Sequence, residues 1–185
     1  MTGSSESTED RYPNLRRVVT GHDEAGRSVV LMDGPCTFHG AGGTSWRVQD
    51  IWEHDTVPIP IDGAEADPTV GPVNFNLPET GLRVRITDIP PTPAGSEHFM
   101  HRTNSVDYLH VLEGEITMLL DDEDHEVTFR KGDTIVQRAT NHAWVNRTDK
   151  HCRLFIVMVA GRITESLEKA IGPMPEWDPN HRRAG

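Results

Sequence analysis

The sequence predicts an all-β fold, either a small barrel or a jelly roll, in one domain. With 185 residues the chain is long enough for one domain with a sizeable core. Only 35% of its residues are apolar, and 16 glycines and 13 prolines are spread along it, as is typical of short strands joined by turns. The third observation is a close succession of short β-type runs between residues 82 and 160.

The part of the chain before this succession divides into a tail and an extended region. Residues 1–12 are polar and charged, so we expect a mobile tail there. Residues 13–81 hold additional N-terminal strands and a proline-rich loop. The expected strands are 15–20, 28–32 and 45–52, of which the first two form a hairpin. Residues 55–80 contain five prolines, which cannot donate to a sheet ladder, so this stretch is predicted to be a loop that serves as a lid or a dimer-facing arm.

Residues 82–160 are predicted to form the barrel core. Runs rich in β-branched and aromatic residues, separated by Gly, Pro, Asp and Asn, fall at 82–89, 97–103, 106–112, 115–120, 125–129, 134–137, 143–146 and 153–159. Residues 161–185 form a short C-terminal helix and a tail. Apolar residues near helical spacing place this helix at 163–171, and Gly172-Pro173 ends it.

Alternation along the strands assigns side chains to faces. Phe99, His101 and Thr103 share one face of the run 97–103, and His98 points to the other. On the next run, if Asp107 points into a barrel, His110 points away from it.

One stretch has a spacing that matches a known family motif. Gly95 is followed by five residues, His101-Arg-Thr103, three residues, Asp107, six residues and Gly114. This frame resembles the first motif of the cupin superfamily, which carries Gly, His-x-His, Glu and Gly at these positions. Thr103 stands where the family has its second His, and Asp107 stands where it has Glu.

A second stretch is similar to the second cupin motif. It begins at Gly132 and places His142 and Asn146 in the family's relation to each other. Arg138 replaces the motif's Pro, its second Gly is missing, and the spacer is one residue shorter. The resemblance covers roughly residues 82–160.

The resemblance implies a double-stranded β-helix, the cupin jelly-roll barrel, whose motif residues surround a divalent metal, usually iron, manganese, zinc or nickel. His101, Asp107 and His142 would be the metal ligands and the catalytic residues, and two His with one carboxylate are chemically adequate for Fe(II). Asp is shorter than Glu by about 1.5 Å of reach. With or without a metal, the three residues make a polar pocket, and without one Asp107 beside a histidine could act as an acid–base pair.

Four further residues are candidates for substrate binding. Thr103 is a poor metal ligand, and we expect it to hydrogen-bond water or substrate. Gln137 either points inward, where its amide could orient a substrate carbonyl, or faces solvent. Trp144 lies on the face of His142 and, with Phe99, forms either a stacking wall for a planar ligand or ordinary core.

Charge and hydropathy limit the partners. The net charge of −11 disfavours nucleic acids and anionic membranes. No apolar run is long enough for a membrane helix and the N-terminus lacks a signal-peptide pattern, which predicts a cytoplasmic protein. Cupins commonly dimerise through extra strands, so the resemblance implies a homodimer built on residues 15–54.

The function predicted from these observations is that of an enzyme acting on a small metabolite, weakly favoured to be aromatic or polyketide-like. A metal held by the three ligands would serve either a dioxygenase or a lyase or cyclase. The alternative is a metal-free barrel that binds a small ligand without turning it over.

Overall fold

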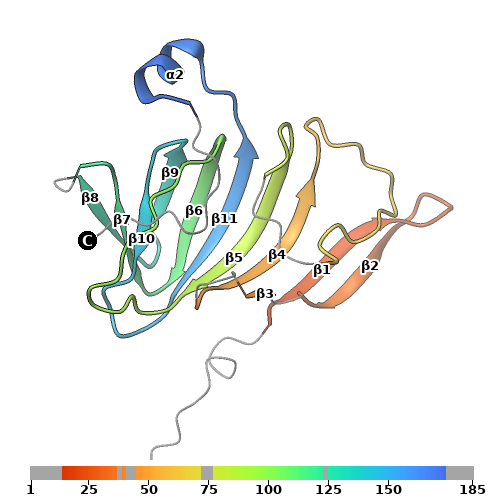
Figure 1. Cartoon of the computed structure of the whole chain (residues 1–185). Helices are drawn as coiled ribbons and strands as arrows, with labels where there is room; N and C mark the ends of the chain where they lie inside the picture. Colours follow the sequence, from red (N-terminus) through yellow and green to blue (C-terminus); the bar gives the residue numbers. More distant parts are fainter. Residues whose placement is uncertain (1–13, 37–38, 41–44, 72–76, 123–124, 174–185) are drawn as a thin grey trace, which may run out of the picture.

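A sheet of six strands and a sheet of three strands make up the barrel of the computed structural model (Figure 1). The structure describes residues 14–36, 39–40, 45–71, 77–122 and 125–173, so the tail predicted at 1–12 lies outside them. The strands are β1 Arg16–His22, β2 Ser28–Pro35, β3 His39–Gly40, β4 Arg47–His54, β5 Leu82–Ile89, β6 Ser105–Glu113, β7 Glu115–Leu119, β8 Glu126–Arg130, β9 Thr134–Arg138, β10 Ala143–Val145 and β11 Cys152–Ala160. The helix is α2 Glu165–Ile171. The all-β prediction, with one short C-terminal helix, is confirmed.

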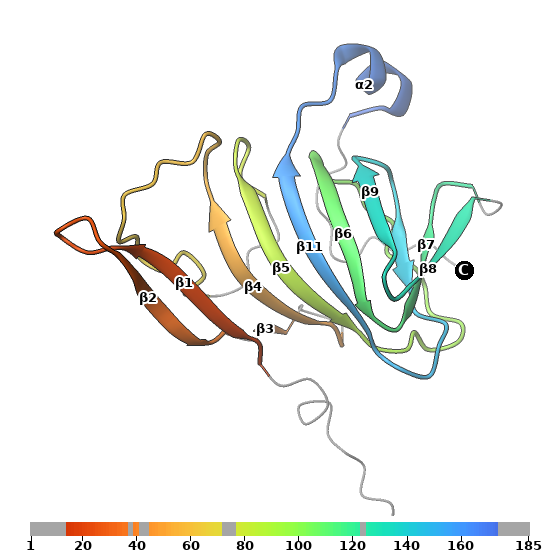
Figure 2. The same cartoon turned by 180° about the vertical axis from the view of Figure 1, so that it is seen from behind.

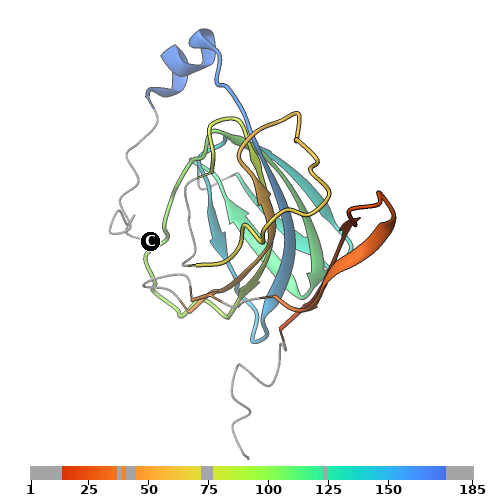
Figure 3. The same cartoon turned by 90° about the vertical axis from the view of Figure 1, so that its right-hand side faces the viewer.

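Sheet order explains how residues far apart in the chain come together. The large sheet has the order β3-β4-β5-β11-β6-β9, the small one β10-β7-β8, and β1-β2 form a separate hairpin. Viewed from the side, the two barrel sheets face each other (Figure 3). The C-terminal strand β11 thus lies between β5 and β6.

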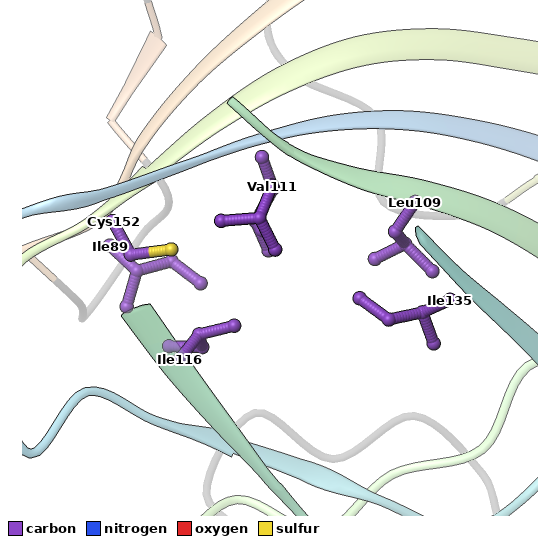
Figure 4. Close-up of a cluster of buried hydrophobic side chains, with 7 residues drawn as sticks. Ile89, Leu109, Val111, Ile116, Ile135 and Cys152 are labelled. Carbon is purple, nitrogen blue, oxygen red and sulfur yellow. The ribbon is translucent and has the colours of Figure 1, made fainter. Parts of the chain in front are cut away.

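The apolar core fills one end of the barrel. Side chains from both sheets point toward one another there (Figure 4), namely Ile89, Leu109, Val111, Ile116, Ile135, Cys152 and Leu154. Because Leu109 and Val111 point inward on β6, alternation places Asp107 on the same inward face.

One predicted strand is wrong. Residues 97–103 alternate in polarity but form no strand, and His101 makes only an isolated antiparallel bridge with His142. Alternation alone does not make a strand, because the backbone also needs a ladder partner. The other predicted runs each fall on a strand of the structure.

The hairpin β1–β2 lies alongside the outer edge of the barrel (Figures 1 and 2). Arg17 holds it there: Nη1 donates to the carbonyl of Ile51 at 3.1 Å and to Thr69 Oγ1 at 3.0 Å, and the guanidinium pairs with Asp67. Asp67 and Thr69 belong to the proline-rich loop. That loop therefore packs against the hairpin of the same chain. The homodimer expected from residues 15–54 stays a prediction.

Helix α2 stands beyond the end of β11 (Figure 2). Arg102 holds its C-terminal end, donating to the carbonyls of Ile171, Gly172 and Pro173 at 3.3, 3.1 and 2.7 Å. Within the described ranges, no helix has the length and apolar character needed to cross a membrane.

Gly114, between β6 and β7, is required by both its conformation and its surroundings. Its φ is +82°, and a Cβ added to it would lie 2.6 Å from the carbonyl oxygen of His151. We expect Gly114→Ala to lower the free energy of unfolding by about 2 kcal/mol, because it adds a backbone clash to the left-handed strain.

Gly95 is the matched control, since its φ is +74° and an added Cβ meets nothing within 4 Å. Gly95→Ala should cost about 1 kcal/mol, the strain alone. Urea unfolding of both variants measures the two effects, and equal losses would contradict the close approach at Gly114.

Candidate functional site

A layer of polar residues lies inside the barrel, toward the end of β11 that leads to α2. Strand register aligns five residues across the inward face of the large sheet at this end: Glu53, Arg83, Met158, Asp107 and Gln137. One step deeper, the aligned residues are Asp50, Arg85, Ile156, Leu109 and Ile135. On β6 and β9 the interior therefore changes from polar to apolar over one step, while β4 and β5 still carry the charged residues Asp50 and Arg85 in the deeper row.

His101 and His142 are held side by side by their backbones. Each donates its amide hydrogen to the other's carbonyl at 2.9 Å, which forms the isolated bridge. Residues directly opposite in such a bridge project to the same side. The ring centroids of the two histidines are 4.3 Å apart, with an angle of 47° between the planes.

The tautomer of both histidines follows from their neighbours. His142 Nδ1 lies 3.0 Å from the carbonyl of Thr140, and His101 Nδ1 lies 3.3 Å from the carbonyl of Phe99. Because a carbonyl only accepts, each Nδ1 carries the hydrogen and each Nε2 keeps its lone pair. Burial lowers the pKa of both rings, and for His142 the nearby His101 lowers it further. Both histidines are neutral near pH 7.

Asp107 is 6% exposed. Burial raises its pKa to about 6, against a hydrogen bond from Ser105 and the charge of Arg85, which both lower it. Its Oδ1 is buried and has no hydrogen-bond partner among the described residues. The carboxyl group is thus kept in the barrel without the full set of partners that a buried carboxylate needs.

Gln137 faces Asp107 across β6 and β9 and points inward, as one of its two predicted orientations required. Its Nε2 donates to the carbonyl and to Oγ1 of Thr140, at 3.0 and 3.3 Å. Nε2 also lies 3.3 Å from His142 Nδ1, which carries a hydrogen itself and so cannot accept from it. The remaining atom, Oε1, is buried and unpaired within the described part of the chain.

This orientation bears on the expected role of Gln137. The amide N–H groups are turned toward Thr140, because a carbonyl there can only accept. The group of Gln137 left for a ligand is therefore its carbonyl oxygen. Such an atom suits a hydrogen-bond donor rather than the substrate carbonyl that the sequence suggested.

Thr103, Phe99 and Trp144 lie around the histidines and the carboxylate. Thr103 Oγ1 is 2.8 Å from Ser105 Oγ, so it is linked through Ser105 to Asp107. The Phe99 ring stacks on His101 with centroids 5.2 Å apart, and Trp144 meets His142 edge-on at 5.6 Å. Both aromatic rings thus support the histidines. Their role as a wall for a planar substrate stays a prediction.

The sequence analysis missed the charged residues of the same interior. Arg85 is paired with Asp50 through two hydrogen bonds of 2.9 and 3.2 Å, and Arg83 is paired with Glu53 at 2.7 Å. Arg83 and Arg85 alternate with apolar residues on a predicted strand that ends in the core residue Ile89, and this pattern could have revealed them.

The residues present do not complete a metal site. The two histidines carry their hydrogens on Nδ1, and an imidazole with this tautomer can bind a divalent metal through Nε2. In the part of the chain that the structure describes, however, no three side chains among His, Cys, Asp and Glu are grouped so that they could hold one ion. A catalytic metal is typically held by three protein ligands. Asp107 belongs to the same polar layer but does not close such a group with the histidines.

Comparison with known proteins gives concordant matches. The family model described as "Cupin domain" matches residues 85–159. "Phomopsin biosynthesis cluster protein C'" of Diaporthe leptostromiformis is 35% identical over 156 residues, covering 78% of this chain and 76% of that protein. "Cupin-domain-containing oxidoreductase fogC" of Aspergillus ruber is 34% identical, covering 71% and 64%. Among solved structures, an RmlC-like cupin from Shewanella frigidimarina matches with a TM-score of 0.42 and 15% identity, covering 71% and 88%.

Proposed function

The chain belongs to the cupin family, and from that premise we propose that it is a biosynthetic enzyme that moves protons on a small organic metabolite, using His101, His142 and Asp107. The relatives support the setting, since those from Diaporthe leptostromiformis are named as proteins of a biosynthesis cluster. The reaction itself is argued from the site.

One observation carries the proposal: two neutral histidines and a buried carboxyl group are linked by neighbouring residues of the barrel. His101 and His142 are bridge partners, Nδ1 of His142 lies 3.3 Å from Nε2 of Gln137, and Gln137 is opposite Asp107 in the strand register. Nδ1 of His142 carries the hydrogen, so its Nε2 can act as a base. Buried groups of this kind, with shifted pKa values, mark catalytic sites more often than structural ones.

The proposed reaction is a redox-neutral proton transfer. A histidine Nε2 accepts a proton from a carbon or hydroxyl of the substrate, the protonated ring exchanges with solvent, and the ring then donates a proton to another atom of that substrate. The pKa of Asp107, about 6, lets this group exchange protons near neutral pH as the second partner. This chemistry suits an isomerase, lyase or cyclase and consumes no other reactant.

The test incubates the protein with a panel of enolisable hydroxylated ketones in D2O that contains EDTA. Mass spectrometry then measures how much deuterium each ketone has incorporated. We expect incorporation with the parent protein and a loss of about 100-fold or more in His142→Gln, the usual effect of removing a catalytic base. His110→Gln is the matched control, because His110 lies on the outward face of β6 and contacts Thr134.

Two results would contradict the proposal. No incorporation by the parent, with ligands recovered unchanged, would favour a binding barrel without catalysis. Activity that EDTA abolishes and an added divalent metal restores would favour a second candidate, a metal-assisted reaction. The word oxidoreductase in the names of three relatives and the adjacent rings of His101 and His142 speak for that candidate. Elemental analysis would then show near-stoichiometric metal in the parent and a loss of it in His142→Ala.

A further inference from the structure

Two buried oxygen atoms on facing strands have no partner in the described residues. They are Asp107 Oδ1 on β6 and Gln137 Oε1 on β9. The two side chains are 6% and 2% exposed, and their residues are directly opposite in the strand register. Opposite residues place their Cβ atoms about 5 Å apart, so both oxygens belong to one small region of the interior.

Neither atom can satisfy the other by simple rotation. The amide of Gln137 is fixed by Thr140, which takes both of its donor contacts and leaves only the acceptor for the interior. An ionised Asp107 has no hydrogen to donate. Two buried acceptors side by side cost free energy until donors reach them.

We propose that Asp107 Oδ1 and Gln137 Oε1 form a two-acceptor clamp that selects substrates carrying two neighbouring hydrogen-bond donors, a specificity that depends on the proposed function of the site. The chemical class is a neutral molecule with adjacent hydroxyl groups, or with a hydroxyl beside an N–H.

The surroundings exclude the opposite class of ligand. Nε2 of His142 is also an acceptor, because Nδ1 of this ring carries the hydrogen, so the interior offers more than two lone pairs. Arg85 forms its hydrogen bonds to Asp50, and Arg83 is paired with Glu53. A carboxylate or phosphate placed against the clamp would meet negative charge and lone pairs and would be repelled.

Three compounds with the same ring and the same two oxygen positions test the clamp without any turnover: catechol, its monomethyl ether guaiacol and its dimethyl ether veratrole, with two, one and no hydroxyl groups. Their dissociation constants are measured by ligand-observed NMR in the presence of EDTA, so that metal chelation by catechol plays no part. We expect affinity to fall about tenfold for each hydroxyl removed, since each loss leaves a buried acceptor unpaired.

Two variants address the clamp separately. Gln137→Met removes Oε1 at similar volume, and Asp107→Leu removes both carboxylate oxygens at similar volume. Each should reduce the ratio of catechol to guaiacol affinity about tenfold. Gln49→Met is the matched control, because Gln49 is as buried as Gln137. Its Oε1, however, accepts a hydrogen bond from the backbone N–H of Leu15, next to the hairpin β1–β2. That variant should leave the ratio unchanged.

Equal affinity for the three compounds, or an unchanged ratio in both site variants, would overturn the clamp and leave bound water as the partner of the two oxygens. Failure of the deuterium test alone would remove the enzyme and leave the clamp standing as a recognition site. The two proposals therefore fail by different results.

Discussion

Asp107→Asn is expected to make the protein more stable at pH 8 by about 3 kcal/mol, and to leave its stability almost unchanged at pH 4. Burial raises the pKa of Asp107 to about 6, from an ordinary value of 3.8 in the unfolded chain. Below about pH 3 the carboxyl group is protonated in both states and costs nothing. As the pH rises from 4 to 6, the unfolded chain loses this proton more readily than the folded one, and the parent loses stability. The asparagine side chain has the same shape and does not ionise.

The measurement is urea unfolding of parent and variant at intervals between pH 4 and pH 8, reported as the difference in free energy of unfolding. Asp33→Asn is a control for an exposed carboxylate. Arg16 pairs with Asp33 and lowers its pKa, so Asp33 is ionised in the folded and the unfolded chain over nearly the whole range, and the difference for this variant should stay flat between about pH 5 and pH 8. A pH-independent difference for Asp107→Asn would show that Asp107 is not desolvated as the structure has it.

A stabilising substitution inside a barrel has a functional meaning. Binding and catalytic sites typically contain residues whose replacement by a neutral residue of the same shape makes the protein more stable. The cost of an ionised Asp107 would be offset when a ligand donates to Oδ1. The stabilisation that a two-donor ligand gives the parent should therefore be larger than the one it gives Asp107→Asn.

The barrel could be predicted from the sequence because its strands and turns are indicated by short stretches of neighbouring residues. Strands were recognised by alternation between turn residues, and the spacing from Gly95 to Gly114 identified the motif. The same reasoning failed at residues 97–103, where the polarity alternates but the structure supplies isolated bridge residues, His98 and His101, and no strand. Whether a run becomes a strand depends on a partner that the run itself does not specify.

The sequence predicted which residues belong to the candidate site, but it did not predict which of their atoms are available to a ligand. His101, His142, Asp107 and Gln137 could be named because motif and alternation assign them to the interior. Asp107 and Gln137 face each other because of the register between β6 and β9. The free atom of Gln137 depends on the direction of the Thr140 carbonyl, which follows Ala139 with its φ of +50°. Such details come from tertiary geometry.

Arg85 and Asp50 form a buried ion pair in which each charge depends on its partner. Arg85→Met is expected to lower the free energy of unfolding by about 3–5 kcal/mol, because it leaves the carboxylate of Asp50 buried without its partner. The two side chains are 7% and 9% exposed, and Nε and Nη2 of Arg85 bind the two oxygens of Asp50. Loss of Arg85 also removes a charge that lowers the pKa of Asp107, so the stability of the variant should fall further as Asp107 ionises.

Comparison with an exposed pair of the same geometry isolates burial as the cause. Arg16 and Asp33 form a two-pronged pair on the hairpin, with side chains 72% and 47% exposed, and Arg16→Met should leave stability unchanged within the error of urea unfolding. The double variant Asp50→Leu/Arg85→Met removes both buried charges and should recover most of the stability that Arg85→Met loses, because an apolar pair of similar volume needs no partner. If the double variant were no more stable than Arg85→Met, the loss would come from packing of the arginine stem, and the buried carboxylate would not be its cause.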